Sequence, residues 1–227
     1  MWRVAESRED YKGDTMKKLL FLALLLPGIL LAEGDYSVDD KVVELIITKK
    51  PSVIKEENKR KSKRDILPYA DKAVCSGSLV SDQGDILTAR HCVVSAEYID
   101  VVLNDKREYR ATVVKVSDKH DLAWIRIDEL TPAHFKFATQ VGRGQRIFVL
   151  GSPLAISNTL ATGIVAKISG DIMLIDCSAL PGNSGGPVLN EDGEIIGVVV
   201  AGFWVGFGTT HLNIAQSLAS VYFFFTR

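Results

Sequence analysis

A short glycine-rich turn presents one serine hydroxyl in the surroundings that a nucleophile needs. Residues 182–188 read Gly-Asn-Ser-Gly-Gly-Pro-Val, directly after Pro181. Glycine adopts backbone angles that a Cβ would obstruct, and it lets a substrate come close to the main chain. The backbone N–H groups of Gly182 and Ser184 can then point to one spot and stabilise a developing oxyanion. These are the requirements of acyl-transfer chemistry.

A serine hydroxyl is a poor nucleophile near neutral pH, so this turn needs a base and a group that orients the base. The sequence supplies candidates for both. His91 follows a short apolar run in Leu-Thr-Ala-Arg-His-Cys, and Asp121 directly precedes an alternating apolar segment. A neutral imidazole can take the Ser184 proton, while a buried carboxylate fixes its tautomer and stabilises the imidazolium. Asp100 and Asp118 are the competing candidates for the acid.

Four segments of the chain resemble the chymotrypsin superfamily of serine peptidases, in family order and at family-like separations. The sequence is most similar to the HtrA/DegP-like and glutamyl-endopeptidase-like bacterial branch, from about Pro51 to the C-terminus. Several motifs in register are much more specific than any one of them. The matching segments are Gly77–Val93, Ala111–Asp128, Gly163–Ile168 and Ile175–Val198.

The resemblance implies a serine endopeptidase that hydrolyses internal peptide bonds through an acyl-enzyme, without a cofactor. His91, Asp121 and Ser184 would form the catalytic triad, with the Gly182 and Ser184 amides as the oxyanion hole. The Asp-Leu-Ala-Trp-Ile context matches the family pattern and therefore favours Asp121 as the acid. Taken singly, each motif also fits a β-turn, a structural histidine or a turn-forming aspartate.

Two other classes of function remain as alternatives. A catalytically silent peptidase homologue would use the cleft as a peptide-binding module, although such proteins usually lose at least one triad residue. A secreted esterase is disfavoured, because α/β-hydrolases carry Gly-x-Ser-x-Gly after a strand and place the histidine last in the chain.

Short alternating or β-branched stretches recur from Ala73 onward, with turn signals between them. This rhythm predicts an all-β fold, because no internal helix is long enough to cover a parallel sheet. The resemblance implies two six-stranded antiparallel β-barrels with the active site in the cleft between them. A C-terminal helix is expected to close the domain.

The expected organisation has three parts: an N-terminal extension with a signal peptide, a lead-in segment and the peptidase domain. Their predicted bounds are 1–32, 33–50 and 51–227. Within the peptidase domain, the first barrel, the second barrel and the closing helix are expected at about 51–130, 140–213 and 214–225.

Two segments before the first barrel have less distinct patterns. Val42–Ile47 fits either a helix or an edge strand. The charged run Lys55–Arg64 predicts a solvated loop between the first two strands, in preference to a membrane-surface or regulatory contact.

The resemblance implies a disulfide between Cys75 and Cys92, which would tie the strand before the histidine to the histidine's own turn. Such a bridge contributes about 3 kcal/mol in an oxidising compartment. Two buried thiols are the alternative. Cys177 is expected to be a packed core thiol. Cysteines and histidines show no paired metal-ligand spacing, so no metal is expected.

Residues Met16–Ala32 have the pattern of a secretory signal peptide. Two lysines precede an apolar stretch that ends in a small residue, so cleavage is expected near Ala32. An uncleaved anchor is the alternative, and a start at Met16 would explain the residues from Met1 onward. The protein is expected to be exported to the periplasm or the medium, without stable membrane association once the signal is removed.

The overall composition fits an exported enzyme. The 227 residues are 47% hydrophobic with a formal net charge of −1, which supports a sizeable core and excludes the basicity of a general nucleic-acid binder. The expected partners are protein or peptide substrates. The oligomeric state stays open, with a monomer favoured, because too few residues follow Ser184 for a PDZ domain.

By alignment with the family, the pocket for the residue before the scissile bond would be lined by Ser178, Val199, Val200, Ala201, Gly202 and Gly208. Ser178 stands where trypsin-like members carry an aspartate, and Val199 where glutamate-cutting relatives carry a histidine. Cleavage after small or medium apolar residues is therefore expected. Asn183 replaces the aspartate that digestive zymogens use in activation, so no such activation is expected.

Overall fold

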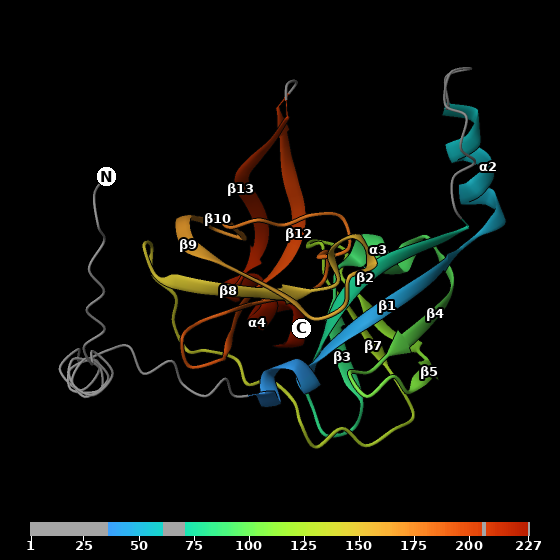
Figure 1. Cartoon of the computed structure of the whole chain (residues 1–227), viewed down its shortest axis with the longest axis horizontal. Helices are drawn as coiled ribbons and strands as arrows, with labels where there is room; N and C mark the ends of the chain where they lie inside the picture. Colours follow the sequence, from blue (N-terminus) through green and yellow to red (C-terminus); the bar gives the residue numbers. More distant parts are fainter. Residues whose placement is uncertain (1–35, 61–70, 206–207, 227) are drawn as a thin grey trace, which may run out of the picture. The chain divides into compact units, whose positions relative to one another are not determined.

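Alternation of buried and less buried residues runs through the strands of the computed structural model, which describes residues 36–60, 71–205 and 208–226. In β1 (Val42–Lys49), for example, Val43, Leu45 and Ile47 are buried while the residues between them are partly exposed. Strands are the main regular secondary structure of the described residues (Figure 1). The predicted signal peptide lies outside the described residues.

The first sheet has seven antiparallel strands in the order β5-β4-β1-β2-β3-β7-β6. Its further strands are β2 (Lys72–Leu79), β3 (Asp85–Thr88), β4 (Ala96–Val102), β5 (Glu108–Arg110), β6 (Thr112–Val116) and β7 (Ala123–Arg126). The two edge strands, β5 and β6, are joined by Ala111 alone, whose N–H donates to Ile99 O at 2.9 Å. The two edges of the sheet are therefore formed by neighbouring segments of the chain, which requires the sheet to curl round on itself. Counted as one bent strand, β5 and β6 give the six strands expected.

The second sheet is a closed barrel of six strands in the order β10-β13-β12-β11-β8-β9. These are β8 (Arg146–Gly151), β9 (Thr159–Ser169), β10 (Ile172–Asp176), β11 (Pro187–Leu189), β12 (Ile195–Val205) and β13 (Gly208–Ser217). The long strands β12 and β13 form a hairpin that is prominent in Figure 1. The fold class predicted from the sequence is confirmed.

β1 corrects the predicted lead-in segment. It is neither a helix nor an edge strand, because it pairs with β2 on one side and β4 on the other. The first sheet therefore begins before Pro51, the predicted start of the peptidase domain.

Helices occupy the connections and the C-terminal end. They are η1 (Tyr36–Lys41), α2 (Pro51–Arg60), α3 (Arg90–Val94), η2 (Pro153–Ala155) and α4 (Leu218–Thr226). The prediction of a loop over Lys55–Arg64 was wrong for Lys55–Arg60, which belong to α2. This helix begins with Pro51, and proline is suited to the first helical position. Helix α4 starts later than residue 214, because Ile214–Ser217 still belong to β13. Among the described residues, no helix is long and apolar enough to cross a membrane.

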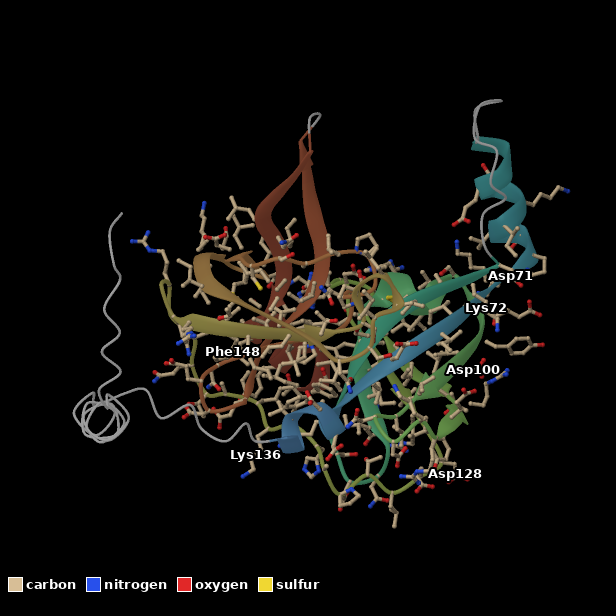
Figure 2. All side chains as sticks on the ribbon, in the orientation of Figure 1. Asp71, Lys72, Asp100, Asp128, Lys136 and Phe148 are labelled. Atoms are coloured by element: carbon tan, nitrogen blue, oxygen red, sulfur yellow. A yellow bond between two sulfur atoms is a disulfide. The ribbon has the colours of Figure 1, made fainter. Side chains whose placement is uncertain are left out.

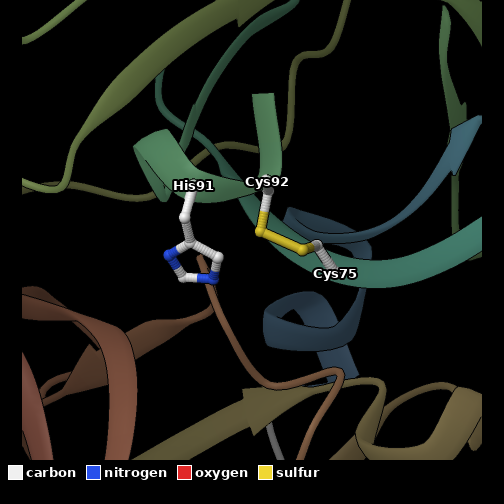
Figure 3. A group of neighbouring side chains, drawn as sticks. All are labelled: Cys75, His91 and Cys92. Carbon is white, nitrogen blue, oxygen red and sulfur yellow. A yellow bond between two sulfur atoms is a disulfide. The ribbon is translucent and has the colours of Figure 1, made fainter. Parts of the chain in front are cut away.

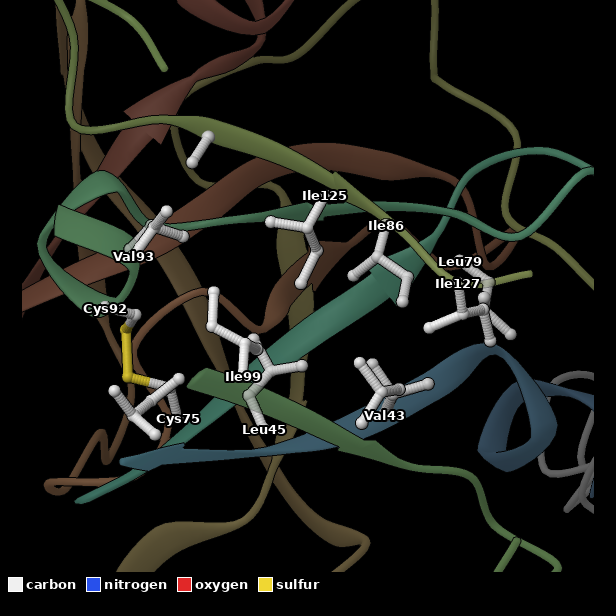
Figure 4. Close-up of a cluster of buried hydrophobic side chains, with 14 of the residues drawn as sticks. Val43, Leu45, Cys75, Leu79, Ile86, Cys92, Val93, Ile99, Ile125 and Ile127 are labelled. Carbon is white, nitrogen blue, oxygen red and sulfur yellow. A yellow bond between two sulfur atoms is a disulfide. The ribbon is translucent and has the colours of Figure 1, made fainter. Parts of the chain in front are cut away.

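Apolar side chains fill each sheet and join the two. Figure 4 shows the cluster inside the first sheet, which includes Val43, Leu45, Ile86, Ile99 and Ile125. Charged side chains such as Lys72 and Asp128 lie on the outside (Figure 2). A cluster shared by both halves contains Leu87, Leu122, Val198, Val221 and Phe224. This shared core fixes the segments from which the candidate site is built.

Candidate active site

His91 and Asp121 lie in direct contact beside the neighbouring strands β3 and β7 of the first sheet. His91 is in α3, and Asp121 is in the turn before β7. The His91 backbone N–H donates to Asp121 Oδ1 at 2.9 Å, and the ring Nδ1 lies 2.8 Å from Oδ2. A hydrogen bond from Nδ1 to the carboxylate leaves Nε2 as the acceptor, the tautomer that a general base requires.

The exposure of the pair suits a reacting site, but it differs from the expectation of a buried acid. The side chains of His91 and Asp121 are 46% and 32% exposed. Burial raises the pKa of Asp121, while its hydrogen bonds to His91 lower it, and the net result is a pKa below the usual value. The carboxylate therefore stays ionised beside the imidazole.

The two competing acids are placed elsewhere. Asp100, on β4, accepts a hydrogen bond from Arg110 Nε at 2.7 Å. Asp118 is exposed in the turn that follows β6. Of the three candidates for the acid, Asp121 is the one that is hydrogen-bonded to His91 in the described part of the chain.

A disulfide joins the His91 helix to the strand beneath it. Cys75 on β2 is bonded to Cys92, with Cα atoms 6.4 Å apart, as the resemblance implied. Figure 3 shows the sulfur–sulfur bond next to the His91 ring. The sulfur atoms of Cys75 and Cys92 and a ring nitrogen of His91 lie within 4.8 Å of one another, a grouping that resembles a metal site. The two sulfurs are bonded to each other, however.

The glycine-rich turn lies against the same part of the first sheet. Ser184 O accepts a hydrogen bond from Ser76 N–H at 2.8 Å and lies 3.9 Å from Cys92 Sγ. Gly185 has a φ of +86°, and a Cβ there would collide with Thr88 Oγ1 and Ser76 O. These contacts bring the Ser184 backbone beside the disulfide that flanks His91.

Hydrogen bonds to two carbonyls of the turn orient the two candidate oxyanion donors. In a trans peptide the C=O and N–H point in opposite directions. Pro181 O accepts from Leu154 N–H at 2.8 Å, which sets the direction of the Gly182 N–H. Asn183 O accepts from Gly186 N–H at 2.9 Å, which sets the direction of the Ser184 N–H.

The residues expected to line the specificity pocket do not all face solvent. Val199 is 2% exposed inside the second barrel, and Val200 is 8% exposed in the cluster of the first sheet. Ser178 and Gly202 are exposed. For Ala201 and Gly208 the structure describes the backbone alone, so the pocket lining stays a prediction.

Cys177 is the buried thiol that the sequence predicted. It is free and 3% exposed, in the core of the second barrel. Burial and the nearby Asp176 raise its pKa to about 11, so it is a protonated thiol at neutral pH.

Sequence reasoning missed Ser76 and the segment from Ser152 to Leu154. Ser76 is fully buried and contacts the glycine-rich turn through both its backbone and its hydroxyl. Its position next to Cys75 was the available signal, but a single serine in a strand carries no pattern of its own. The Leu154 contribution is a backbone N–H, which any residue except proline can supply.

Comparison with known proteins places the chain in a family. Residues 75–198, more than half of the chain, match the trypsin-like peptidase domain, and the chain belongs to this family of serine proteases.

Curated proteins of HtrA and DegP type are among the matches. Serine protease HTRA1A of Danio rerio is 34% identical over 211 residues, which cover 82% of this chain and 42% of the relative. A DegP-like protein from a Marinomonas species, described as a probable periplasmic serine endoprotease, is 35% identical over 133 residues, 54% of this chain and 28% of the relative. The chain thus spans less than half the length of either relative.

Solved structures show the same fold. The HtrA-type protease AlgW with a decapeptide has a TM-score of 0.62 at 24% identity, covering 79% of this chain and 61% of that one. A serine endoprotease from Yersinia pestis has a TM-score of 0.63 at 24% identity, covering 82% and 62%.

Proposed function

We propose that the protein is a serine endopeptidase in which Ser184 is the nucleophile, His91 the general base and Asp121 the residue that orients the base. The observation that carries this proposal is the pair of hydrogen bonds from His91 to Asp121, beside a turn that holds Ser184 next to Cys92. Membership in the trypsin-like family supports it.

The mechanism is a two-step acyl transfer. Ser184 Oγ attacks the carbonyl carbon while its proton passes to His91 Nε2, and the Gly182 and Ser184 amides stabilise the oxyanion. The tetrahedral intermediate collapses, and His91 gives its proton to the leaving amine. Water then attacks the acyl-enzyme, with His91 as the base again, and Ser184 is regenerated as the carboxylic acid leaves.

The proposed substrates are proteins or peptides cut after a small or medium apolar residue. The HtrA-type protease AlgW named above was solved with a decapeptide, which supports peptides as the class of ligand. A cleavage profile on a peptide library tests the preference. Apolar residues are expected directly before the cut, and a profile dominated by arginine, lysine or glutamate would overturn it.

We propose that the protein acts after export. A DegP-like relative is described as periplasmic, and the Cys75–Cys92 bond is of the kind that persists in oxidising compartments. Fractionation of cells that produce the full chain should recover the protein outside the cytoplasm, whereas purely cytoplasmic recovery would contradict export.

Hydrolysis of casein tests the catalytic assignment. Ser184→Ala should lower turnover about 10⁴- to 10⁶-fold while the folded structure persists. Ser169→Ala, at an exposed serine on β9, is the matched control and should keep the parent rate. Equal rates in the parent and the Ser184 variant would remove Ser184 from the mechanism.

A further inference from the structure

Ser76 connects the first sheet to the glycine-rich turn through its backbone. It lies on β2, next to Cys75, and it is fully buried. Its N–H donates to Ser184 O at 2.8 Å, and its carbonyl accepts from Thr88 Oγ1 at 2.8 Å. These two bonds hold Ser76 in place, and neither requires a serine side chain at this position.

The Ser76 hydroxyl makes two more hydrogen bonds, both to distant backbone. It donates to Gly182 O at 2.7 Å and accepts from the Ser152 N–H at 2.9 Å. The hydroxyl therefore bridges the glycine-rich turn and the segment that follows β8. Gly182 and Ser152 are also packed tightly, because a Cβ on Gly182 would collide with Ser152 O.

These bonds act on both peptide groups that flank the Gly182 α-carbon. The Gly182 carbonyl is held directly by Ser76. On the other side, the Gly182 N–H is directed by the bond from Leu154 N–H to Pro181 O. Leu154 belongs to the same short segment as Ser152, so the bond from Ser152 to Ser76 anchors the donor of that second interaction.

The anchored segment is one that would relax without support. Leu154 and Ala155 have φ values of +54° and +62°, a region that residues with a Cβ rarely adopt. Such conformations persist only where surrounding contacts hold them. The Ser76 hydroxyl supplies one of these contacts at the start of the segment.

We propose that Ser76 is a positioning residue whose hydroxyl fixes the Gly182 amide in the direction that stabilises the oxyanion. The proposal rests on the proposed function, since it assigns Gly182 N–H to the oxyanion hole. Ser76 does not touch the reacting atoms. It acts on the Gly182 carbonyl directly. It acts on the Gly182 N–H indirectly, through the Ser152–Leu154 segment and its hydrogen bond to Pro181 O.

Steady-state kinetics of Ser76→Ala on a peptide substrate test the proposal. Loss of one direct oxyanion donor lowers kcat about 10²- to 10³-fold, so loss of a residue that orients the donor should lower kcat about 10- to 100-fold. KM should stay within about twofold, because the ground-state carbonyl does not depend on the donor as the oxyanion does. The affinity for a peptide boronate, which forms a tetrahedral adduct with Ser184, should fall in parallel with kcat.

Ser78→Ala is the matched control. Ser78 lies on the same strand and is fully buried, but its hydroxyl makes no hydrogen bond within the described part of the chain. Its removal should leave kcat and boronate affinity unchanged within about twofold. Ser76→Ala with the same kcat and boronate affinity as Ser78→Ala would overturn the proposal, as would a loss confined to KM.

Thr88→Val provides a second variant if Ser76→Ala does not fold. It removes only the bond from Thr88 Oγ1 to Ser76 O and keeps the side-chain volume. Its kcat should fall several-fold with KM unchanged, and an unaltered kcat would count against the proposal. Failure of the proposed function itself is separate, because the parent protein would then hydrolyse no peptide and bind no boronate.

Discussion

At the scale of single residues, the contact that matters most is the double hydrogen bond from His91 to Asp121. One carboxylate oxygen holds the backbone of the histidine and the other holds its ring. The ring therefore cannot turn or change tautomer without losing a hydrogen bond to an ionised group, which is among the stronger kinds in proteins.

Asp121→Asn should lower kcat/KM about 10⁴-fold, because an amide opposite the ring favours the tautomer in which Nε2 carries the proton. Asp118→Asn is the control, since Asp118 is exposed in the same turn. Peptide hydrolysis by the two purified variants decides between them. A larger loss in the Asp118 variant would reassign the acid.

At the scale of secondary-structure elements, the disulfide ties β2 to α3, and the hydrogen bonds of Asp85 tie β3 to β7. Cys75 and Cys92 connect β2 to α3 across a separation of 17 residues. Asp85, at the start of β3, accepts from Trp124 Nε1 at 2.7 Å and from Arg126 Nε at 2.6 Å on β7. His91 follows β3 in the chain and Asp121 precedes β7, so both features connect elements that adjoin these two candidate residues.

Removal of the disulfide should lower the free energy of unfolding. Replacing Cys75 and Cys92 together by alanine should cost about 3 kcal/mol, because the unfolded chain gains the freedom of an unclosed loop. Denaturant unfolding with and without a reductant measures the effect. Cys177→Ala, which removes the free thiol, should keep the sensitivity of the parent to the reductant. A parent protein insensitive to reductant would contradict the prediction.

Asp85 should make the fold sensitive to acid. Burial raises the pKa of Asp85, but the hydrogen bonds from Arg126, Ser81 and Trp124 together lower it by more than burial raises it. The pKa in the folded state is therefore below the usual value. The ionised carboxylate therefore stabilises the fold above its unfolded pKa of about 3.9, and this contribution is lost as the pH falls through the folded pKa.

Asp85→Asn should be about 1–3 kcal/mol less stable than the parent at neutral pH, because it weakens a hydrogen-bonded ion pair. Its stability should also fall less than that of the parent between about pH 5 and pH 2. Urea unfolding at neutral pH and across the range from about pH 5 to pH 2 tests both expectations, with Asp128→Asn as an exposed control. Identical pH dependence in the parent and the Asp85 variant would be the contrary result.

At the scale of the whole molecule, the candidate site depends on how the two halves are held together. The cluster of Leu87 and Leu122 with Val198, Val221 and Phe224 joins the first sheet, the second barrel and α4. Polar contacts add to it, since Asp171 Oδ2 lies 3.3 Å from both Lys119 Nζ and His120 Nε2. Leu122, Lys119 and His120 all flank Asp121, so the acid is attached to both halves.

Phe224→Ala should destabilise the protein by about 3–5 kcal/mol, because it opens a cavity in this shared cluster. Phe223→Ala is the neighbouring control, at a position that is 37% exposed, and should cost less. Denaturant unfolding of both variants measures the difference. Equal losses would show that α4 does not contribute through the buried side chain.

The sequence predicted the strands and the residue types of the site, because alternation and spaced motifs are local properties. His91 and Asp121 were found by their neighbours in the chain, and the structure places them in contact. The sequence left Val42–Ile47 open between a helix and an edge strand, and only its pairing with both β2 and β4 defines it as an interior strand. The role of Ser76 depends on two backbone groups far away in the chain, which no local pattern encodes.

The central claim is that Ser184 is an activated nucleophile, and a fluorophosphonate probe tests it most directly. Only a serine next to a functioning base reacts readily with such a probe. Mass spectrometry of the folded, disulfide-bonded protein should find one adduct, on the peptide that contains Ser184. Ser184→Ala should show none, and His91→Ala should react far more slowly. A parent protein that stays unlabelled, or is labelled at another residue, would contradict the account.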